Sequence, residues 1–191
     1  MPEKIYSNIL NVSNRKEFRK WLEENCTVEK ECYVVLKRGK PKDDGNLYYL
    51  DVVEEALCFG WIDSTIRVIN GISYQRFSPR SKKSSWTELN KERVRRLERL
   101  GLMTDEGRKV LPEDFDKKFV VDEETQKALK KARVWSKFCL FPPLYQRIRA
   151  SNLEFYRKRH KEGYERMLNH TIEATKKGEM FGEWNDYGRL I

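Results

Sequence analysis

The sequence lacks the features that would identify a membrane, metal or cofactor protein. No apolar run reaches about 18 residues, which excludes a transmembrane helix. The start of the chain, Met1-Pro2-Glu3-Lys4-Ile5, lacks the basic and then apolar layout of a signal peptide, so we expect a cytosolic protein. The four cysteines and two histidines do not have zinc-ligand spacing. A glycine-rich phosphate loop, a G-x-S-x-G elbow and an H-E-x-x-H motif are also missing. We therefore expect no metal or cofactor and assign no catalytic residue.

The composition is that of a folded chain. Hydrophobic residues make up 39% of the 191 residues, with five Trp, nine Tyr and nine Phe. This content argues against disorder, although 36% of the residues are charged. A chain of this length can bury a substantial core, as one domain or as two small ones.

The net charge of +9 is concentrated in one segment. Between Lys127 and Arg166 the chain has twelve basic and three acidic residues, and the remainder is neutral. Such an asymmetry indicates a possible nucleic-acid surface. The residues we would assign to it are Lys130, Lys131, Arg147, Arg149, Arg157 and Arg159. Aromatic residues between them could stack on bases, or could form a core beneath a solvated basic face.

Local patterns predict an α+β fold with a small, mainly antiparallel sheet. The expected helices are 14–25, 51–59, 85–100, a short one from 104, 123–138 and 145–177. Capping signals are Asn14, Asp51 with Glu54, and Ser85 with Glu88. The expected strands are 31–37, 65–69 and 72–77, the last two joined by a hairpin turn at Asn70-Gly71.

The charge and element patterns also predict the domain organisation. We expect an α+β domain over residues 1–111 and a connection over residues 112–122. A basic helical module then covers residues 123–191. The aromatic end of the chain, Met180 to Arg189, is predicted to dock on the body of the protein rather than form a free tail.

The candidate binding site lies where an apolar helix, a hairpin and a basic loop follow one another. Its residues are Trp61, Asp63, Arg76, Arg80, Lys82, Lys83, Ser85 and Trp86. Arginines near a helix start favour an anion, with Arg76 and Arg80 as its contacts and Asp63 as their orienter. Trp61 and Trp86 would form the walls. The alternative is that Asp63 pairs with an arginine for structural reasons and that the tryptophans belong to the core.

A catalytic role would have to come from Cys58 or Asp63 with a perturbed pKa. Cys58 lies within an apolar helical run, where burial raises the pKa of a thiol and makes it unreactive. Packing is therefore the better interpretation of Cys58. An enzyme acting on a small acidic metabolite stays open as an alternative.

Several segments resemble the bacterial YdeI/OmpD-associated family, also described as bacteriocin-protection proteins. They are Trp21-Leu22-Glu23-Glu24-Asn25, Tyr33-Val34-Val35-Leu36-Lys37, the run Glu54 to Ser64 with its centre Cys58-Phe59-Gly60-Trp61-Ile62-Asp63, Gln75-Arg76-Phe77-Ser78-Pro79-Arg80, Ser85-Trp86-Thr87-Glu88-Leu89-Asn90, and Gly101-Leu102-Met103-Thr104. The later helices, from Phe141-Pro142-Pro143 onward, look like the C-terminal module of that family. The chain departs from it at residues 152–159 and at its ending, residues 182–186.

The resemblance implies a role in survival against bacteriocins and a link to outer-membrane porins. The leading hypothesis is thus a non-catalytic cytosolic protection protein that binds an anionic small molecule or an acidic protein partner, without inserting into a membrane. Binding of nucleic acid through the basic helices is the second hypothesis.

Overall fold

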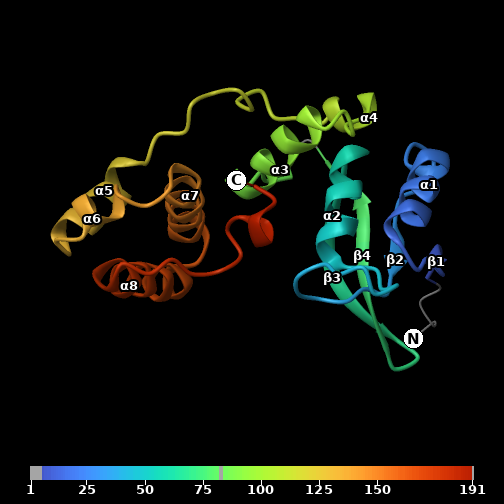
Figure 1. The fold of residues 1–191 in the computed structure, drawn as a ribbon, viewed down its shortest axis with the longest axis horizontal. Coiled ribbons are helices and arrows are strands. Elements are labelled where there is room, and N and C mark those ends of the chain that lie inside the picture. Colours follow the sequence, from blue (N-terminus) through green and yellow to red (C-terminus); the bar gives the residue numbers. More distant parts are fainter. Residues whose placement is uncertain (1–5, 82–83, 191) are drawn as a thin grey trace. The chain divides into compact units, whose positions relative to one another are not determined.

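The computed structural model describes residues 6–81 and 84–190, and the chain divides into two compact units. The first unit contains residues 1–85 and 93–113, and the second contains residues 86–92 and 114–191. The predicted α+β fold is confirmed, because a small mixed sheet and several helices are present (Figure 1).

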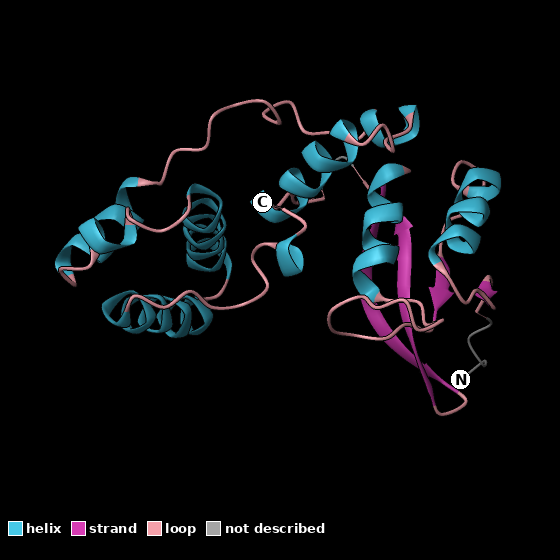
Figure 2. Cartoon of the chain, viewed as in Figure 1, coloured by secondary structure: helices cyan, strands magenta, loops and turns pink. Residues whose placement is uncertain are grey.

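The sheet belongs to the first unit and is mainly antiparallel, as predicted (Figure 2). Its strands are β1 (Ile9–Leu10), β2 (Cys32–Val34), β3 (Trp61–Ile69) and β4 (Ile72–Pro79), in the order β1-β2-β4-β3. Only β1 and β2 run parallel. The predicted turn joins β3 to β4, and Asn70 and Gly71 both have positive φ, 50° and 78°. That backbone suits the right-handed twist of a two-residue hairpin.

Two helices cover the same face of the sheet. They are α1 (Arg15–Asn25) and α2 (Tyr49–Cys58), which lie side by side in Figure 1. Phe18 of α1 packs on Phe77 of β4, with ring centroids 5.8 Å apart. Asp63 of β3 lies directly opposite Phe77, and the hydroxyl of Tyr49 in α2 reaches it. Directly opposed residues share a face of a sheet, so both helices lie on the Phe77 side.

Two predicted helix starts were wrong. Asn14 does cap α1, since its side chain accepts from the Glu17 N–H. However, α2 begins at Tyr49 and has no side-chain cap, so Asp51 lies within its first turn. The next helix, α3 (Glu88–Arg99), is capped by Thr87, whose Oγ1 accepts from the Asn90 N–H at 3.1 Å. Ser85 therefore lies outside the helix that it was predicted to open. The short α4 (Asp105–Arg108) begins at Thr104 as expected.

The second unit is helical. Its helices are α5 (Glu123–Lys131), α6 (Trp135–Phe138), α7 (Pro143–Arg159), α8 (Lys161–Lys177) and the 3₁₀ turn η1 (Asp186–Gly188). The prediction of one helix over residues 145–177 was wrong, because His160 has extended backbone and separates α7 from α8. Phe181 and Trp184 pack against a core that contains Leu129 and Phe138, so the tail docks as predicted.

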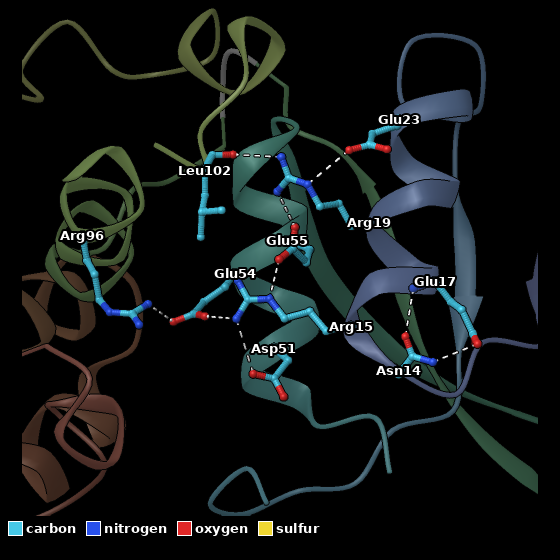
Figure 3. Close-up of polar contacts among 10 residues, drawn as sticks. All are labelled: Asn14, Arg15, Glu17, Arg19, Glu23, Asp51, Glu54, Glu55, Arg96 and Leu102. Atoms are coloured by element: carbon cyan, nitrogen blue, oxygen red, sulfur yellow. Dashed lines mark hydrogen bonds and ion pairs between the residues drawn. The ribbon is translucent and has the colours of Figure 1, made fainter. Parts of the chain in front are cut away.

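Two buried carboxylates hold the helices of the first unit together (Figure 3). Glu54 and Glu55 of α2 are 0% and 2% exposed. Arg15 of α1 binds both carboxylates. Arg19 of α1 donates to Glu55 at 2.8 Å, and Arg96 of α3 donates to Glu54 at 2.9 Å. The predicted capping role of Glu54 was wrong, because its carboxylate pairs with these arginines instead.

The ion pairs are required by burial. A carboxylate that leaves water loses several kcal/mol of hydration, which only opposite charge and hydrogen bonds can offset. Side chains of Arg15 and Arg96 remain 30% and 22% exposed, so the cations keep part of their own hydration while they neutralise buried anions. The network therefore fixes α1 and α3 against α2.

We predict that Glu54→Gln destabilises the protein strongly. The variant removes the carboxylate that pairs with Arg96 and one of the two buried carboxylates that Arg15 binds. This should cost about 3 kcal/mol, the low end for breaking a buried pair, because both arginines can reach water and Arg15 keeps Glu55. Glu23→Gln is the matched control, since Glu23 also pairs with an arginine but is 53% exposed. It should change the free energy of unfolding by less than about 0.5 kcal/mol. Urea denaturation followed by circular dichroism tests this, and equal effects of the two variants would contradict it.

Candidate anion-binding site

The site begins with an irregularity in the hairpin. Asp63 pairs with Phe77, and Ile66 pairs with Gln75, so three steps on β3 match two steps on β4. Such a β-bulge inserts one residue, bends the strand and leaves backbone groups outside the ladder. Here the carbonyl of Ser64 accepts a hydrogen bond from the side chain of Gln75 at 2.9 Å. The bulge thereby fixes the Gln75 amide.

Gln75 in turn positions Arg38. The Gln75 side chain is buried, and its Oε1 accepts from Arg38 Nη2 at 2.9 Å. The Arg38 guanidinium also lies over the ring of Tyr49, 4.3 Å from the centroid. Arg38 itself is exposed. Two uncharged groups therefore hold an exposed cation in place.

Tyr49 joins Arg38 to Asp63. Its hydroxyl donates to Asp63 Oδ2 at 2.8 Å. Burial, and then the charge of Asp63, raises the pKa of Tyr49 to about 12, while Arg93 and Arg38 act in the opposite direction. The phenol is therefore a neutral donor at physiological pH, and it holds the Asp63 carboxylate in a fixed direction.

Arg80 is a buried cation that interacts electrostatically with Asp63. Its side chain is 6% exposed, and Nη1 donates to the carbonyl of Ser85 at 3.2 Å. Burial lowers the pKa of Arg80 to about 10, and the charge of Asp63 acts in the opposite direction. Arg80 is still protonated at neutral pH. Its backbone N–H donates to Gly60, which anchors the end of β4 beside the end of α2.

Of the predicted site residues, Asp63 and Arg80 interact electrostatically, whereas others lie apart from them. Trp61 was predicted as an exposed wall but is 1% exposed, because its indole N–H donates to Cys26 and its ring packs on Trp21. Arg76 does not reach the site. It alternates with Gln75 along β4, so its side chain lies on the other face of the sheet.

The remaining predicted residues have different positions. Arg76 donates to Glu31 at 2.7 Å and to the hydroxyl of Ser64 at 3.0 Å. The carbonyl of Ser85 accepts a hydrogen bond from Arg80. Trp86 is assigned to the second unit. Lys82 and Lys83 lie outside the described residues.

The predicted nucleic-acid residues fall into three groups. Lys130, Lys131 and Arg159 are exposed, as such a surface requires. Arg147 pairs with Glu92 at 2.8 Å, and Arg157 pairs with Asp122 at 2.7 Å. Arg149 was wrongly included, because it is 6% exposed and lies 4.1 Å over the ring of Phe181.

The described residues contain neither a metal-binding cluster nor a membrane-spanning helix. In residues 6–81 and 84–190, no group of three or more His, Cys, Asp or Glu side chains could hold a metal ion. Over the same residues, no helix is both long and apolar enough to cross a membrane.

Cys58 is packed in the core rather than presented to a substrate. It is fully buried. Burial, and then the charge of Glu55, raises the pKa of the Cys58 thiol to about 12, although Arg19 and Arg15 act in the opposite direction. The thiolate needed for nucleophilic attack is scarce at neutral pH.

We predict that iodoacetamide at pH 8 modifies exposed Cys139 and leaves Cys58 unmodified in the native protein. With a pKa of about 12, only roughly one Cys58 in 10⁴ is ionised at that pH, and burial blocks the reagent as well. Peptide mass spectrometry measures the labelling. The same reaction in urea, where all four cysteines should react, is the control. Labelling of Cys58 as fast as Cys139 would contradict its assignment to the core.

Comparison with known proteins identifies a family but no activity. Residues 10–110 match the model of a domain of unknown function, DUF8412. No curated protein and no solved structure matches the chain. The matched segment contains Arg38, Tyr49, Asp63, Gln75 and Arg80, and it covers just over half of the sequence. The chain therefore belongs to the DUF8412 family.

Proposed function

We propose that this chain binds a small anion, a carboxylate or a phosphate, at the site formed by Arg38, Tyr49, Asp63, Gln75 and Arg80. The protein acts by binding and not by catalysis. The resemblance to bacteriocin-protection proteins supports a protective role in the cytosol for the protein with its anion bound.

Arg38 is the observation that carries the proposal. Within residues 6–81 and 84–190, no carboxylate pairs with Arg38, and the groups that fix it are the Tyr49 ring and the Gln75 amide. A guanidinium has five N–H donors in a planar fork that matches carboxylates and phosphates. Gln75 accepts a hydrogen bond from one of these donors, so the other N–H groups of the exposed Arg38 side chain can bind a ligand. Because the side chain is already ordered, binding avoids much of the usual entropy cost.

The other site residues shape the preference for an anion. Arg80 is buried and cationic, so a nearby negative charge is favoured electrostatically. Asp63 repels an anion at close range, but its carboxylate already accepts from Tyr49. The ligand charge is therefore expected beside the Arg38 fork, on the side away from Asp63.

We predict that Arg38→Gln weakens anion binding at least tenfold. Charge-assisted hydrogen bonds contribute about 1.5–3 kcal/mol, and about 1.4 kcal/mol corresponds to a factor of ten. Arg67→Gln is the matched control, because Arg67 is an exposed arginine on β3 outside the site. Inorganic phosphate, succinate and citrate serve as probes in calorimetry at low ionic strength. Equal affinity of wild type and Arg38→Gln for the probes that bind would refute this site.

Nucleic-acid binding by the second unit is a second candidate function. The observation that favours it is a set of exposed cations that have no carboxylate partner among the described residues: Lys130, Lys131, Arg133, Lys161 and Arg166. The phosphates of a nucleic acid could pair with these cations. Phe155 is 40% exposed beneath the guanidinium of Arg159, at 4.1 Å, which adds an aromatic surface.

We predict that oligonucleotide affinity falls steeply with salt and that these lysines contribute to the slope. For single strands, log K changes with log salt by about −0.7 per phosphate contact. The double variant Lys130→Gln/Lys131→Gln should therefore reduce the slope by about 1.4. Lys127→Gln should leave it unchanged, since Glu123 and Glu124 already neutralise Lys127. Fluorescence anisotropy measures both effects, and a salt-independent affinity would contradict phosphate contacts.

A further inference from the structure

A cavity of about 220 Å³ opens between α7 and α8 in the second unit. Its lining residues are Tyr156 from α7 and Gly163, Arg166, Met167 and His170 from α8. The four α8 residues recur at intervals of three and four, so they form one stripe of that helix. Tyr156 faces this stripe from the last turns of α7. The cavity is thus built from two rigid helices.

Gly163 keeps the tyrosine wall close to α8. A Cβ atom at position 163 would approach Cδ1 of Tyr156 to 2.9 Å, which is closer than side chains tolerate. His160 fixes the same turn, because its Nδ1 accepts the N–H of Gly163 at 2.9 Å. The absence of a side chain at Gly163 therefore lets the Tyr156 ring lie directly against the start of α8.

A second aromatic wall comes from His170. Its imidazole stacks on the ring of Phe181, with centroids 4.0 Å apart and planes inclined by 14°. Arg149 also lies over the Phe181 ring, at 4.1 Å. These contacts fix the orientation of the His170 imidazole. The polarisable thioether of Met167 also lines the cavity.

The charge at this cavity comes from Arg166. Arg166 is exposed, and no carboxylate of the described chain pairs with it. Lys161, at the start of the same helix, is likewise exposed and has no such partner in the described part of the chain. Two aromatic rings, a thioether and a guanidinium thus surround one small space beside further positive charge.

We propose that this cavity binds one unstacked base of a single-stranded nucleic acid, with Arg166 on the neighbouring phosphate. The proposal rests on the second candidate function and specifies its ligand. Every base has a π face that stacks on aromatic side chains, whatever its identity. The volume is below the roughly 300–1,000 Å³ of sites for larger ligands, so it suits a single ring system. Bases in a duplex are already stacked and cannot enter.

The test compares Tyr156→Leu with Tyr74→Leu in the full chain, since Tyr74 is also a half-buried tyrosine but lies on β4 of the first unit. Both replace an aromatic ring by an apolar side chain, but only Tyr156 lines the cavity. The probe is a fluorescein-labelled oligothymidylate of twelve nucleotides at low salt, measured by anisotropy. Tyr156→Leu should lose about tenfold in affinity with an unchanged salt slope, because it removes stacking and no charge. Tyr74→Leu should change affinity less than twofold.

A second pair of variants covers the case in which Tyr156→Leu does not fold. Arg166→Gln should lower the affinity and reduce the salt slope by about 0.7, whereas the ion-paired Lys127→Gln should do neither. Equal losses within either pair, or a duplex bound as tightly as the single strand, would overturn the base-binding cavity. Failure of the wild-type protein to bind any oligonucleotide would overturn the second candidate function, and the cavity proposal with it.

Discussion

The first unit depends on the neutralisation of two carboxylates that α2 carries into the core. From Leu50 to Cys58 all residues of this helix except Asp51 are buried, so Glu54 and Glu55 cannot reach water. Arginines of α1 and α3 meet them there. The pairs therefore determine where α2 lies on the sheet. Because Tyr49 begins that helix, they also determine where its ring and hydroxyl lie relative to Arg38 and Asp63.

Features set by neighbouring residues were predictable from the sequence. The cap at Asn14 and the turn at Asn70-Gly71 arise from local backbone chemistry, and both are present. Features set by distant partners were not. Glu54 is acidic and close to a helix start in the sequence, so a dipole or capping role was reasonable. Its actual partners, Arg15 and Arg96, are 39 and 42 residues away, and only the packed helices reveal them.

The candidate site shows the same division. Asp63 and Arg80 were predicted, and Arg38, Tyr49 and Gln75 were missed. One usable signal was present, since strand alternation places Gln75, and not Arg76, on the face of the apolar Phe77. The bulge that fixes Gln75 has no local signature, because it follows from the register of two strands. Arg38 lies in a loop, so its position over Tyr49 depends entirely on tertiary packing.

The chain has 39 lysines and arginines. Whether one of them can bind an anionic ligand depends on the group that it already contacts, and not on how many cations there are. A guanidinium beside a buried carboxylate is already neutralised and stabilises the fold, as Arg15 does. A guanidinium ordered by uncharged neighbours, such as Arg38, is not neutralised by them, which is why we propose it as the ligand contact. The exposed cations of α5 and α8 are spread along a surface instead. One ordered fork suits a small anion, whereas spread charge beside an aromatic cavity suits a flexible polyanion whose bases can leave the stack.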